Sequence, residues 1–301
     1  MTTRRIRALE IPEEPEPATA LHTPPVENRN SALRHKASSR TVTSKMTGKR
    51  QKTAIITGGG TGLGRALALR LAQEGYALGL IARSEEPLIG VCSEVAAMNG
   101  KATYRTCDVN RPEALQAAVD DLVHASGGRL DLLVINAAMI GYSKAERAPG
   151  EKVRQILETN IMGSVHTLHA ALPHMLEQGS GHVVAISSLG AFQQWPGGGL
   201  RYYYTSKRSM SLIFGTYRRH LRSQGIHVSI MHPGWIETAM FSSDRRAEKK
   251  AYVDTPESAA DKIYEAIRHR KNALFPFPLF LRIQRQNLTK AVRLVLSRFL
   301  G

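Results

Sequence analysis

Cysteine is scarce in this chain of 301 residues, which contains only Cys92 and Cys107. Two cysteines cannot build a disulfide framework, so we expect a reducing, cytoplasmic compartment. Long hydrophobic runs are also missing. No stretch approaches the roughly eighteen uncharged apolar residues of a membrane-spanning helix, and the first residues lack the apolar segment of a secretory signal. We therefore expect neither a transmembrane helix nor a secretory signal.

Acidic residues are missing from the end of the chain. Residues 268–301 contain eight Lys/Arg and no Asp/Glu, and residues 1–52 contain eleven Lys/Arg and five Glu. The stretch between them, 53–267, is nearly balanced, with twenty-two basic and twenty acidic residues, although the whole chain carries a net charge of +16. A nucleic-acid-binding domain would show a basic patch on its fold. Because the basic excess lies at the two ends, we expect no nucleic-acid partner.

Clusters of metal ligands are missing too. His166 and His169 share a helical face at a spacing that suits a metal ion, but no cluster of Cys or carboxylates accompanies them. We expect no metal site.

The two ends also differ from the middle in pattern. Residues 1–50 are rich in Pro, Glu, Ser and Thr and have no sustained apolar period, which predicts a disordered N-terminal extension. Clustered glutamates disfavour a transit peptide, and Met46 is a second candidate start of the natural chain. Residues 278–301 alternate apolar and basic positions at helical spacing, which predicts a basic amphipathic helix. Its apolar stripe consists of Leu281, Leu288, Val292, Leu296 and Phe299. Two environments could cover that stripe. The helix could lie on an anionic membrane surface, or it could pack on this domain or on a second subunit.

Between these ends, residues 51–277 alternate short apolar runs with helical patterns. The runs predict strands at 53–57, 76–82, 102–107, 131–136, 182–187 and 226–232, with a short one at ALFPF (273–277). Helices are predicted after residue 62, at 86–98, from Pro112, at 151–177, 202–223 and 256–270. The strands are apolar rather than alternating, as in a parallel sheet covered by helices on both faces. The pattern predicts a single α/β domain with a doubly wound parallel sheet of the Rossmann type.

A glycine-rich turn, TGGGTGLG at 57–64, follows the first strand and opens the first helix. Glycines let the backbone approach a pyrophosphate, which then lies at the positive N-terminal end of the helix. Because the motif lies between an apolar strand and an amphipathic helix, we prefer a nucleotide site to an ordinary glycine turn.

The end of the second strand distinguishes the two nicotinamide cofactors. An acid there would bind the adenine ribose, whereas an arginine accommodates a 2′-phosphate. The sequence places Arg83 there and no acid before Glu85, so we expect NADP(H) in preference to NAD(H). The alternative is that Arg83 is a solvated loop cation.

Polar residues also follow the third and fourth strands. Asp108 is placed to meet the adenine amino group, and Asn136 and Ala137 end the fourth strand beside the ribose. The two polar residues could instead be simple turn formers.

Tyr203 and Lys207 stand four residues apart, about one helical turn, so both side chains leave one face of a helix. A phenol titrates near 10 when unperturbed, and an ammonium beside it would lower that pKa. The pair can therefore act as an acid and a base at neutral pH.

With these residues in place, the chain from Thr53 to Pro276 resembles the short-chain dehydrogenase/reductase family. The residues that carry the resemblance are TGGGTGLG at 57–64, CDV at 107–109, NAA at 136–138, Asn160 in ETNIMG, ISSLGA at 186–191, YYTSK at 203–207 and HPGWIET at 232–238. The resemblance implies a catalytic tetrad of Asn160, Ser188, Tyr203 and Lys207. It also implies cofactor contacts by Thr57, Gly58, Gly60, Thr61, Gly62, Leu63, Gly64, Arg83, Asp108, Val109, Asn136, Ala137, Tyr203, Lys207, Pro233, Gly234, Ile236 and Thr238.

Two of the tetrad assignments have alternatives. Ser187 is the second choice for the serine, because adjacent residues on a strand end point opposite ways. Asn160 either links to Lys207 through backbone or water, or is a helix-interior polar residue satisfied locally. The chain departs from the family at Ala138, where glycine is usual, and in a longer Ser188-to-Tyr203 connection. That length puts substrate inference by analogy in doubt.

The expected function is hydride transfer between NADP(H) and a carbonyl or secondary alcohol, with a tyrosine as acid and base. Apolar candidates for the substrate wall favour a hydrophobic substrate: Met139, Ile140, Phe192, Trp195 and Met240. One alternative is a membrane-associated acyl-chain or lipid reductase, which the C-terminal pattern favours. Another is a non-catalytic nucleotide-sensing protein of the same fold. A homo-oligomer through 151–177 and 202–223 is implied by the resemblance only.

Overall fold

The computed structural model describes residues 50–140, 150–193, 200–239, 253–275 and 280–290. The predicted disordered extension, 1–50, therefore lies almost entirely outside the described residues. Within the described ranges, no helix is long and apolar enough to cross a membrane.

Seven parallel strands form one sheet in the order β3-β2-β1-β4-β5-β6-β9. Their bounds are β1 (Thr53–Thr57), β2 (Ala77–Ala82), β3 (Lys101–Thr106), β4 (Leu132–Ile135), β5 (Gly181–Ile186), β6 (Ile226–Pro233) and β9 (Ala273–Phe275). The helices are α1 (Gly62–Gln73), α2 (Glu85–Ala97), α3 (Pro112–Ala125), α4 (Gly150–Leu157), α5 (Gly163–Glu177), α6 (Arg201–Leu221) and α8 (Pro256–Arg268). Short turns of other helix types are η1 (Glu158–Met162), η2 (Leu189–Phe192) and η4 (Arg222–Gln224). The predicted doubly wound parallel sheet is confirmed.

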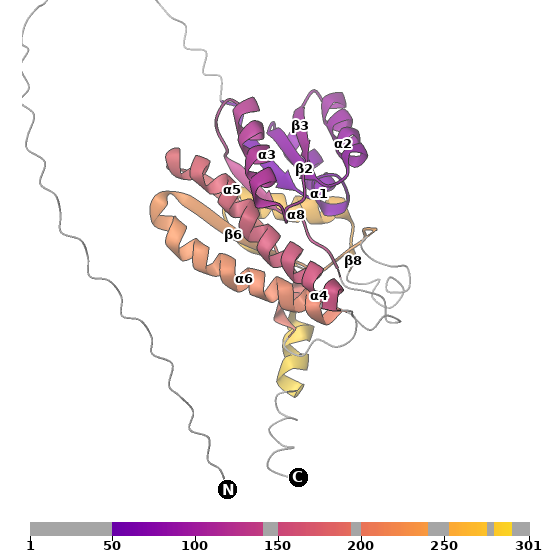
Figure 1. Ribbon diagram of the computed structural model, residues 1–301. Coiled ribbons are helices and arrows are strands. Elements are labelled where there is room, and N and C mark those ends of the chain that lie inside the picture. The colour runs from indigo at the N-terminus through magenta and orange to yellow at the C-terminus, as the bar shows by residue number, and fades with distance from the viewer. Residues whose placement is uncertain (1–49, 141–149, 194–199, 240–252, 276–279, 291–301) are drawn as a thin grey trace, which may run out of the picture. The chain divides into compact units, whose positions relative to one another are not determined.

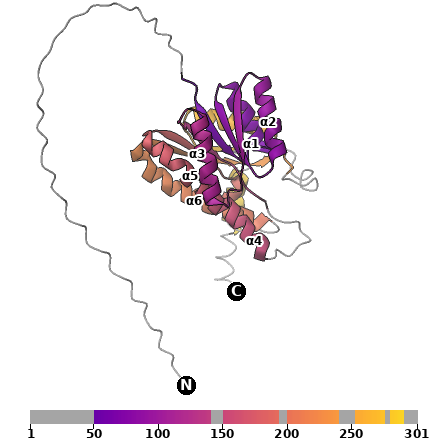
Figure 2. The ribbon, with the colours of Figure 1, turned by 45° about the horizontal axis from the view of Figure 1, so that its top comes forward.

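The strands are apolar because each side of the sheet is covered. In β1, Ala54 and Ile56 belong to the core that α1, α2 and α8 complete, whereas Ile55 belongs to the core of α3, α5 and α6. Figure 2 shows the second set of helices lying in front of the sheet. Alternate residues of one strand are thus buried in two different cores, one on each face of the sheet. Both sets are apolar, so the sequence of the strand shows no alternation of apolar and polar residues.

Strand β3 is an exception to the expected apolar runs. It forms the edge of the sheet, and its side chains alternate between exposed and half-buried. An edge strand has a neighbour on one side only, and charged residues such as Lys101 and Arg105 suit that position.

A second, two-stranded sheet was not predicted. It pairs β7 (Trp235–Ile236) with β8 (Val253–Asp254), in parallel, beyond the end of β6. Two residues per strand are too few to produce a periodic signal.

Strand order reverses at the centre of the sheet. β2 lies on one side of β1 and β4 on the other, so the connections leaving β1 and β4 run in opposite directions. Such a reversal opens a crevice at the carboxyl ends of the strands, where ligands of doubly wound sheets bind.

Candidate active site

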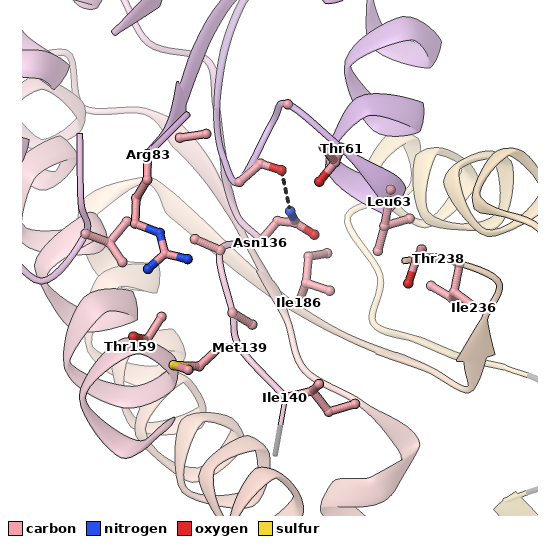
Figure 3. Close-up of a pocket in the computed structure, with 18 of the residues that line it drawn as sticks. Thr61, Leu63, Arg83, Asn136, Met139, Ile140, Thr159, Ile186, Ile236 and Thr238 are labelled. Atoms are coloured by element: carbon pink, nitrogen blue, oxygen red, sulfur yellow. Dashed lines mark hydrogen bonds between the residues drawn. The ribbon is translucent and has the colours of Figure 1, made fainter. Parts of the chain in front are cut away.

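A cavity of about 350 Å³ lies at the carboxyl edge of the sheet. Its lining includes eighteen of the predicted site residues: Gly58, Gly60, Thr61, Gly62, Leu63, Gly64, Arg83, Asp108, Val109, Asn136, Ala137, Ser188, Tyr203, Lys207, Pro233, Gly234, Ile236 and Thr238. Thr57 and Asn160 are not among the lining residues and act from behind them. Figure 3 shows part of this lining.

The glycine turn brings backbone close to backbone. Gly58 has a φ of +68°, a conformation that favours glycine, and its N–H donates to Ile81 O at 2.7 Å. A Cβ on Gly64 would lie 2.0 Å from Gly58 O, so only glycine fits where α1 crosses the turn. Thr61, the N-cap residue of α1, makes no side-chain capping bond, which leaves its hydroxyl available at the helix end.

Asn136 braces this turn from β4. Its Nδ2 donates to Thr57 O at 3.1 Å and to Gly58 O at 3.2 Å. Figure 3 draws one hydrogen bond from Asn136 to the turn. In return, Thr57 Oγ1 accepts from the backbone N–H groups of Asn136 at 3.2 Å and Ala137 at 3.3 Å. Asn136 therefore has a structural role at the turn while it also lines the cavity, and the buried Thr57 supports the site from below.

The nucleotide end of the cavity contains one arginine at the end of β2. Arg83 is exposed, and its guanidinium is turned toward the cavity in Figure 3. The first acid after it, Glu85, accepts a hydrogen bond from Tyr104 OH at 2.9 Å on the neighbouring strand β3. A second cation near the turn, Arg65, is paired with Glu94, with its Nε 3.0 Å from the carboxylate.

Asp108 forms a local turn and also lines the cavity. Its Oδ1 accepts a hydrogen bond from the backbone N–H of Asn110 at 3.0 Å, which closes a local turn. Asp108 is also one of the residues that line the cavity.

At the other end, Ser188, Tyr203 and Lys207 face the same cavity. Ser188 Oγ accepts the N–H of Gly190 at 3.1 Å and hydrogen-bonds with the Tyr203 side chain. Ser187 also lines the cavity, but its hydroxyl is engaged by α6: its Oγ donates to Lys207 O at 3.0 Å and lies 2.7 Å from Ser211 Oγ. The hydroxyls of the two serines thus have different partners, and Ser188 is the one beside the phenol.

The electrostatics of the tyrosine and lysine differ from expectation. Burial raises the pKa of Tyr203 to about 12, and the bond with Ser188 only partly opposes this. Burial likewise lowers the pKa of Lys207 to about 7. Lys207 Nζ donates to Ile186 O at 2.8 Å and lies 5.9 Å from the centre of the Tyr203 ring. The pKa of Tyr203 therefore lies above its usual value, against the expected lowering, because burial disfavours the charged form of both the phenol and the amine.

Asn160 lies in η1, a π-helical turn between α4 and α5. The side chain is fully buried, and its Oδ1 accepts from Met139 N at 2.8 Å. Its Nδ2 donates to Met139 O and to Ser206 Oγ, both at 2.9 Å. The residue therefore fixes the chain after β4 and joins it to α6 through Ser206.

The cavity has lining residues that the sequence motifs did not identify. Pro87 of α2 closes in on Gly60, and Thr159, next to Asn160, accepts a hydrogen bond from Asn110 Nδ2 at 3.0 Å. Pro87 lies in no quoted motif, and Thr159 lies in ETNIMG, where only Asn160 was singled out. Of the proposed substrate wall, Met139 and Ile140 line the cavity, whereas Trp195 and Met240 lie outside the described residues.

Phe192 was expected on the substrate wall but is not among the residues that line this cavity. Its ring instead packs against His232, 4.9 Å between ring centres, and against Phe280, 5.1 Å between ring centres.

The two helical histidines have separate partners: His166 Nδ1 lies 3.1 Å from Val109 O, and His169 Nε2 lies 2.6 Å from Tyr217 OH. Among described residues, no group of three or more His, Cys, Asp or Glu is placed to hold a metal ion.

Comparison with protein families matches residues 52–249 to the family described as short chain dehydrogenase. This chain belongs to that family. An uncharacterized oxidoreductase of Myxococcus xanthus is 35% identical to this short-chain dehydrogenase over 193 residues, covering 64% of this chain and 75% of that protein. Ketoacyl reductase HetN of Nostoc is 30% identical over 233 residues, which cover 73% of this chain and 76% of that protein. Among solved structures, carveol dehydrogenase from Mycobacterium avium in complex with NAD is 28% identical, with a TM-score of 0.60. The match covers 66% of this chain and 77% of that one. Membership in this oxidoreductase family confirms the resemblance that the motifs carry.

Proposed function

We propose that this short-chain dehydrogenase transfers a hydride between NADP(H) and the carbonyl or secondary alcohol group of a hydrophobic substrate. The observation that carries the proposal is the shared cavity: Ser188, Tyr203 and Lys207 line the same space as the glycine turn. A phenol, a hydroxyl and an amine beside a dinucleotide cradle supply the groups that carbonyl reduction needs.

The residues present fit a nicotinamide dinucleotide. Glycine at position 64 lets α1 begin directly against the backbone of Gly58, and the N–H groups at the start of α1 are directed at the turn. Asp108 and Val109 line the adenosine end, and Pro233, Gly234, Ile236 and Thr238 line the other. The M. avium carveol dehydrogenase is described with NAD, which supports a cofactor of this class.

Arg83 supports the choice of the phosphorylated cofactor. It is the cation turned toward the cavity at the end of β2, whereas Arg65 is engaged by Glu94. Glu85, which could bind the ribose diol of NAD, is held by Tyr104. A guanidinium beside the 2′ position favours a phosphate there.

When bound, the nicotinamide supplies the hydride. Tyr203 is protonated at neutral pH, since its pKa is raised to about 12, so it can donate the proton that the carbonyl oxygen requires. Ser188, held by Gly190 N, would hydrogen-bond the same oxygen as negative charge develops. Lys207 and Asn160 would support the site by holding its parts in place. Lys207 is hydrogen-bonded to Ile186 O, and Asn160 is hydrogen-bonded to the backbone of Met139.

The proposal extends to assembly and location. Leu212 of α6 and Met162 of η1 are 69% and 46% exposed, which supports a homo-oligomer that covers the helices on this face. The unpaired thiols of Cys92 and Cys107 support a reducing, cytoplasmic location.

The test of the reaction is a panel of ketones and alcohols, monitored by the absorbance of reduced nicotinamide with NADPH and with NADH. Tyr203→Phe should abolish turnover while cofactor binding, followed by fluorescence, stays within about twofold. Tyr202→Phe is the matched control and should remain active. Cofactor binding by the unmodified protein without turnover of any panel member would favour the nucleotide-sensing alternative.

The test of cofactor choice is Arg83→Ala. The ratio of kcat/KM for NADPH over NADH should fall by at least about tenfold, because a charge-assisted bond to phosphate is lost. Arg65→Ala, which removes an arginine already paired with Glu94, is the control. An unchanged ratio in Arg83→Ala would show that Arg83 is a solvated loop cation.

A further inference from the structure

The helical segment at residues 280–290 is fastened to the turn that follows Ser188. Asn287 Nδ2 donates to Phe192 O at 2.7 Å, and the Phe280 ring meets the Phe192 ring edge-on, 5.1 Å between centres. Asn287 and Ile283 are only 3% and 8% exposed. Spaced at 280, 283 and 287, these residues form the attached face of the segment, the yellow helix near the foot of Figure 1.

Two leucines on the flank of this helix, beside its attached face, are exposed. Leu281 and Leu288, seven residues or about two turns apart, are 52% and 68% exposed. Both belong to the stripe predicted from the sequence. Arg282 and Arg285 are exposed on the same segment. We call Leu281, Leu288, Arg282 and Arg285 the docking face.

Charge distinguishes the two occupants that could cover this face. Residues 268–301 contain eight Lys/Arg and no acid. A second copy meeting this face symmetrically would set Arg282 and Arg285 against their own equivalents, which is repulsive. An anionic lipid surface offers an apolar layer for the leucines and negative headgroups for the arginines.

We propose that the docking face binds an anionic lipid surface, and that the substrate is a lipophilic carbonyl or alcohol dissolved in that membrane. The first part stands on the exposed face alone. The substrate class rests on the proposed function. The helix is hydrogen-bonded to Phe192, four residues after Ser188, so the docking face belongs to an element attached to the turn that follows this serine. Met139 and Ile140 make the described substrate end of the cavity apolar, which suits a lipophilic substrate.

The binding test uses the full chain and sedimentation with vesicles of phosphatidylcholine, with or without phosphatidylserine. The unmodified protein should sediment with the anionic vesicles and not with the neutral ones. Leu281→Ser/Leu288→Ser should weaken binding by at least about tenfold, and Arg282→Gln/Arg285→Gln by about ten- to thirtyfold, since each basic residue near the surface contributes about fivefold.

Matched controls remove equivalent groups elsewhere. Ile89→Ser removes a 47% exposed apolar side chain from α2, and Arg111→Gln/Arg219→Gln removes the same charge from other exposed positions. Both should bind vesicles as the unmodified protein does. Equal binding by docking-face variants, or no binding of anionic vesicles, would overturn the proposal. So would a change of oligomeric mass in the docking-face variants, which would identify a second copy as the occupant.

The substrate part has its own readout. Turnover of a small water-soluble ketone without vesicles should be unchanged in the docking-face variants, whereas kcat/KM for a long-chain ketone carried in anionic vesicles should fall by about tenfold or more. Equal loss on both substrates, or none on the vesicle-borne ketone, would refute the substrate class. Failure of the unmodified protein on every ketone would instead count against the proposed reaction, and vesicle binding would still be decided separately.

Discussion

Replacing Lys207 should change how the stability of this protein depends on pH. Its side chain is 2% exposed, and burial lowers its pKa from 10.5 to about 7. Between these values the unfolded chain binds one more proton than the folded chain, so the free energy of unfolding rises with pH across this window. The slope approaches about 1.4 kcal/mol per pH unit, and the full span corresponds to about 5 kcal/mol.

The measurement is urea unfolding of the unmodified protein and Lys207→Met from about pH 7.5 to about pH 9.5. Methionine retains the apolar stem, and the donor lost from Ile186 O costs an amount that does not vary with pH. Relative to the variant, the unmodified protein should gain about 2–3 kcal/mol over this range. The raised pKa of Tyr203 acts above pH 10 and is present in both proteins.

Lys101→Met, at an exposed position on β3, is the control and should leave the slope unchanged. Parallel pH profiles for the unmodified protein and Lys207→Met would refute the reasoning, because they would mean that the amine keeps an ordinary affinity for protons inside the fold.

Four further substitutions test individual residues of the site and of the core. Ser188→Ala should lower kcat by about 10²-fold. Ser187→Ala, which removes the hydrogen bond to Lys207 O in α6, should lower the free energy of unfolding by about 1 kcal/mol and leave kcat nearly unchanged. Equal effects of the two substitutions on kcat would contradict this. Gly64→Ala should weaken cofactor binding by at least about tenfold in a calorimetric titration, since its Cβ meets Gly58 O at 2.0 Å, and unaltered affinity would argue against the cradle. Phe214→Ala should lower the free energy of urea unfolding by about 3–5 kcal/mol, because the ring is fully buried in the α3, α5 and α6 core; a loss below about 1 kcal/mol would be inconsistent with that packing.

Much of the fold follows from local patterns. The predicted strand at 53–57 coincides with β1, and Pro112 begins α3 as predicted, because apolar runs and first-turn prolines are local signals. The β7–β8 pair has no such signal. Nor could the pattern show that β3 lies at an edge, since strand order depends on the whole topology.

The candidate site divides in a similar way. Motif spacing identified eighteen of the lining residues, but their energetics depend on surroundings that sequence does not reveal. Tyr203 and Lys207 were expected to interact mainly through charge, and burial dominates both instead. The stripe at Leu281 and Leu288 was visible as a pattern. Its orientation was not, because Asn287, a polar residue, lies on the anchored face and is fixed by one carbonyl of Phe192.

The brace from Asn136 to the glycine turn has a consequence for the thermodynamics of ligand entry. Its bonds to Thr57 O and Gly58 O hold the turn against the end of β4 through protein groups alone. The loop is therefore preorganised, so complex formation should lose little backbone entropy at this end of the cavity. Amide hydrogens near Gly58, one of which is bonded to Ile81 O, should exchange slowly with solvent even before any nucleotide is added.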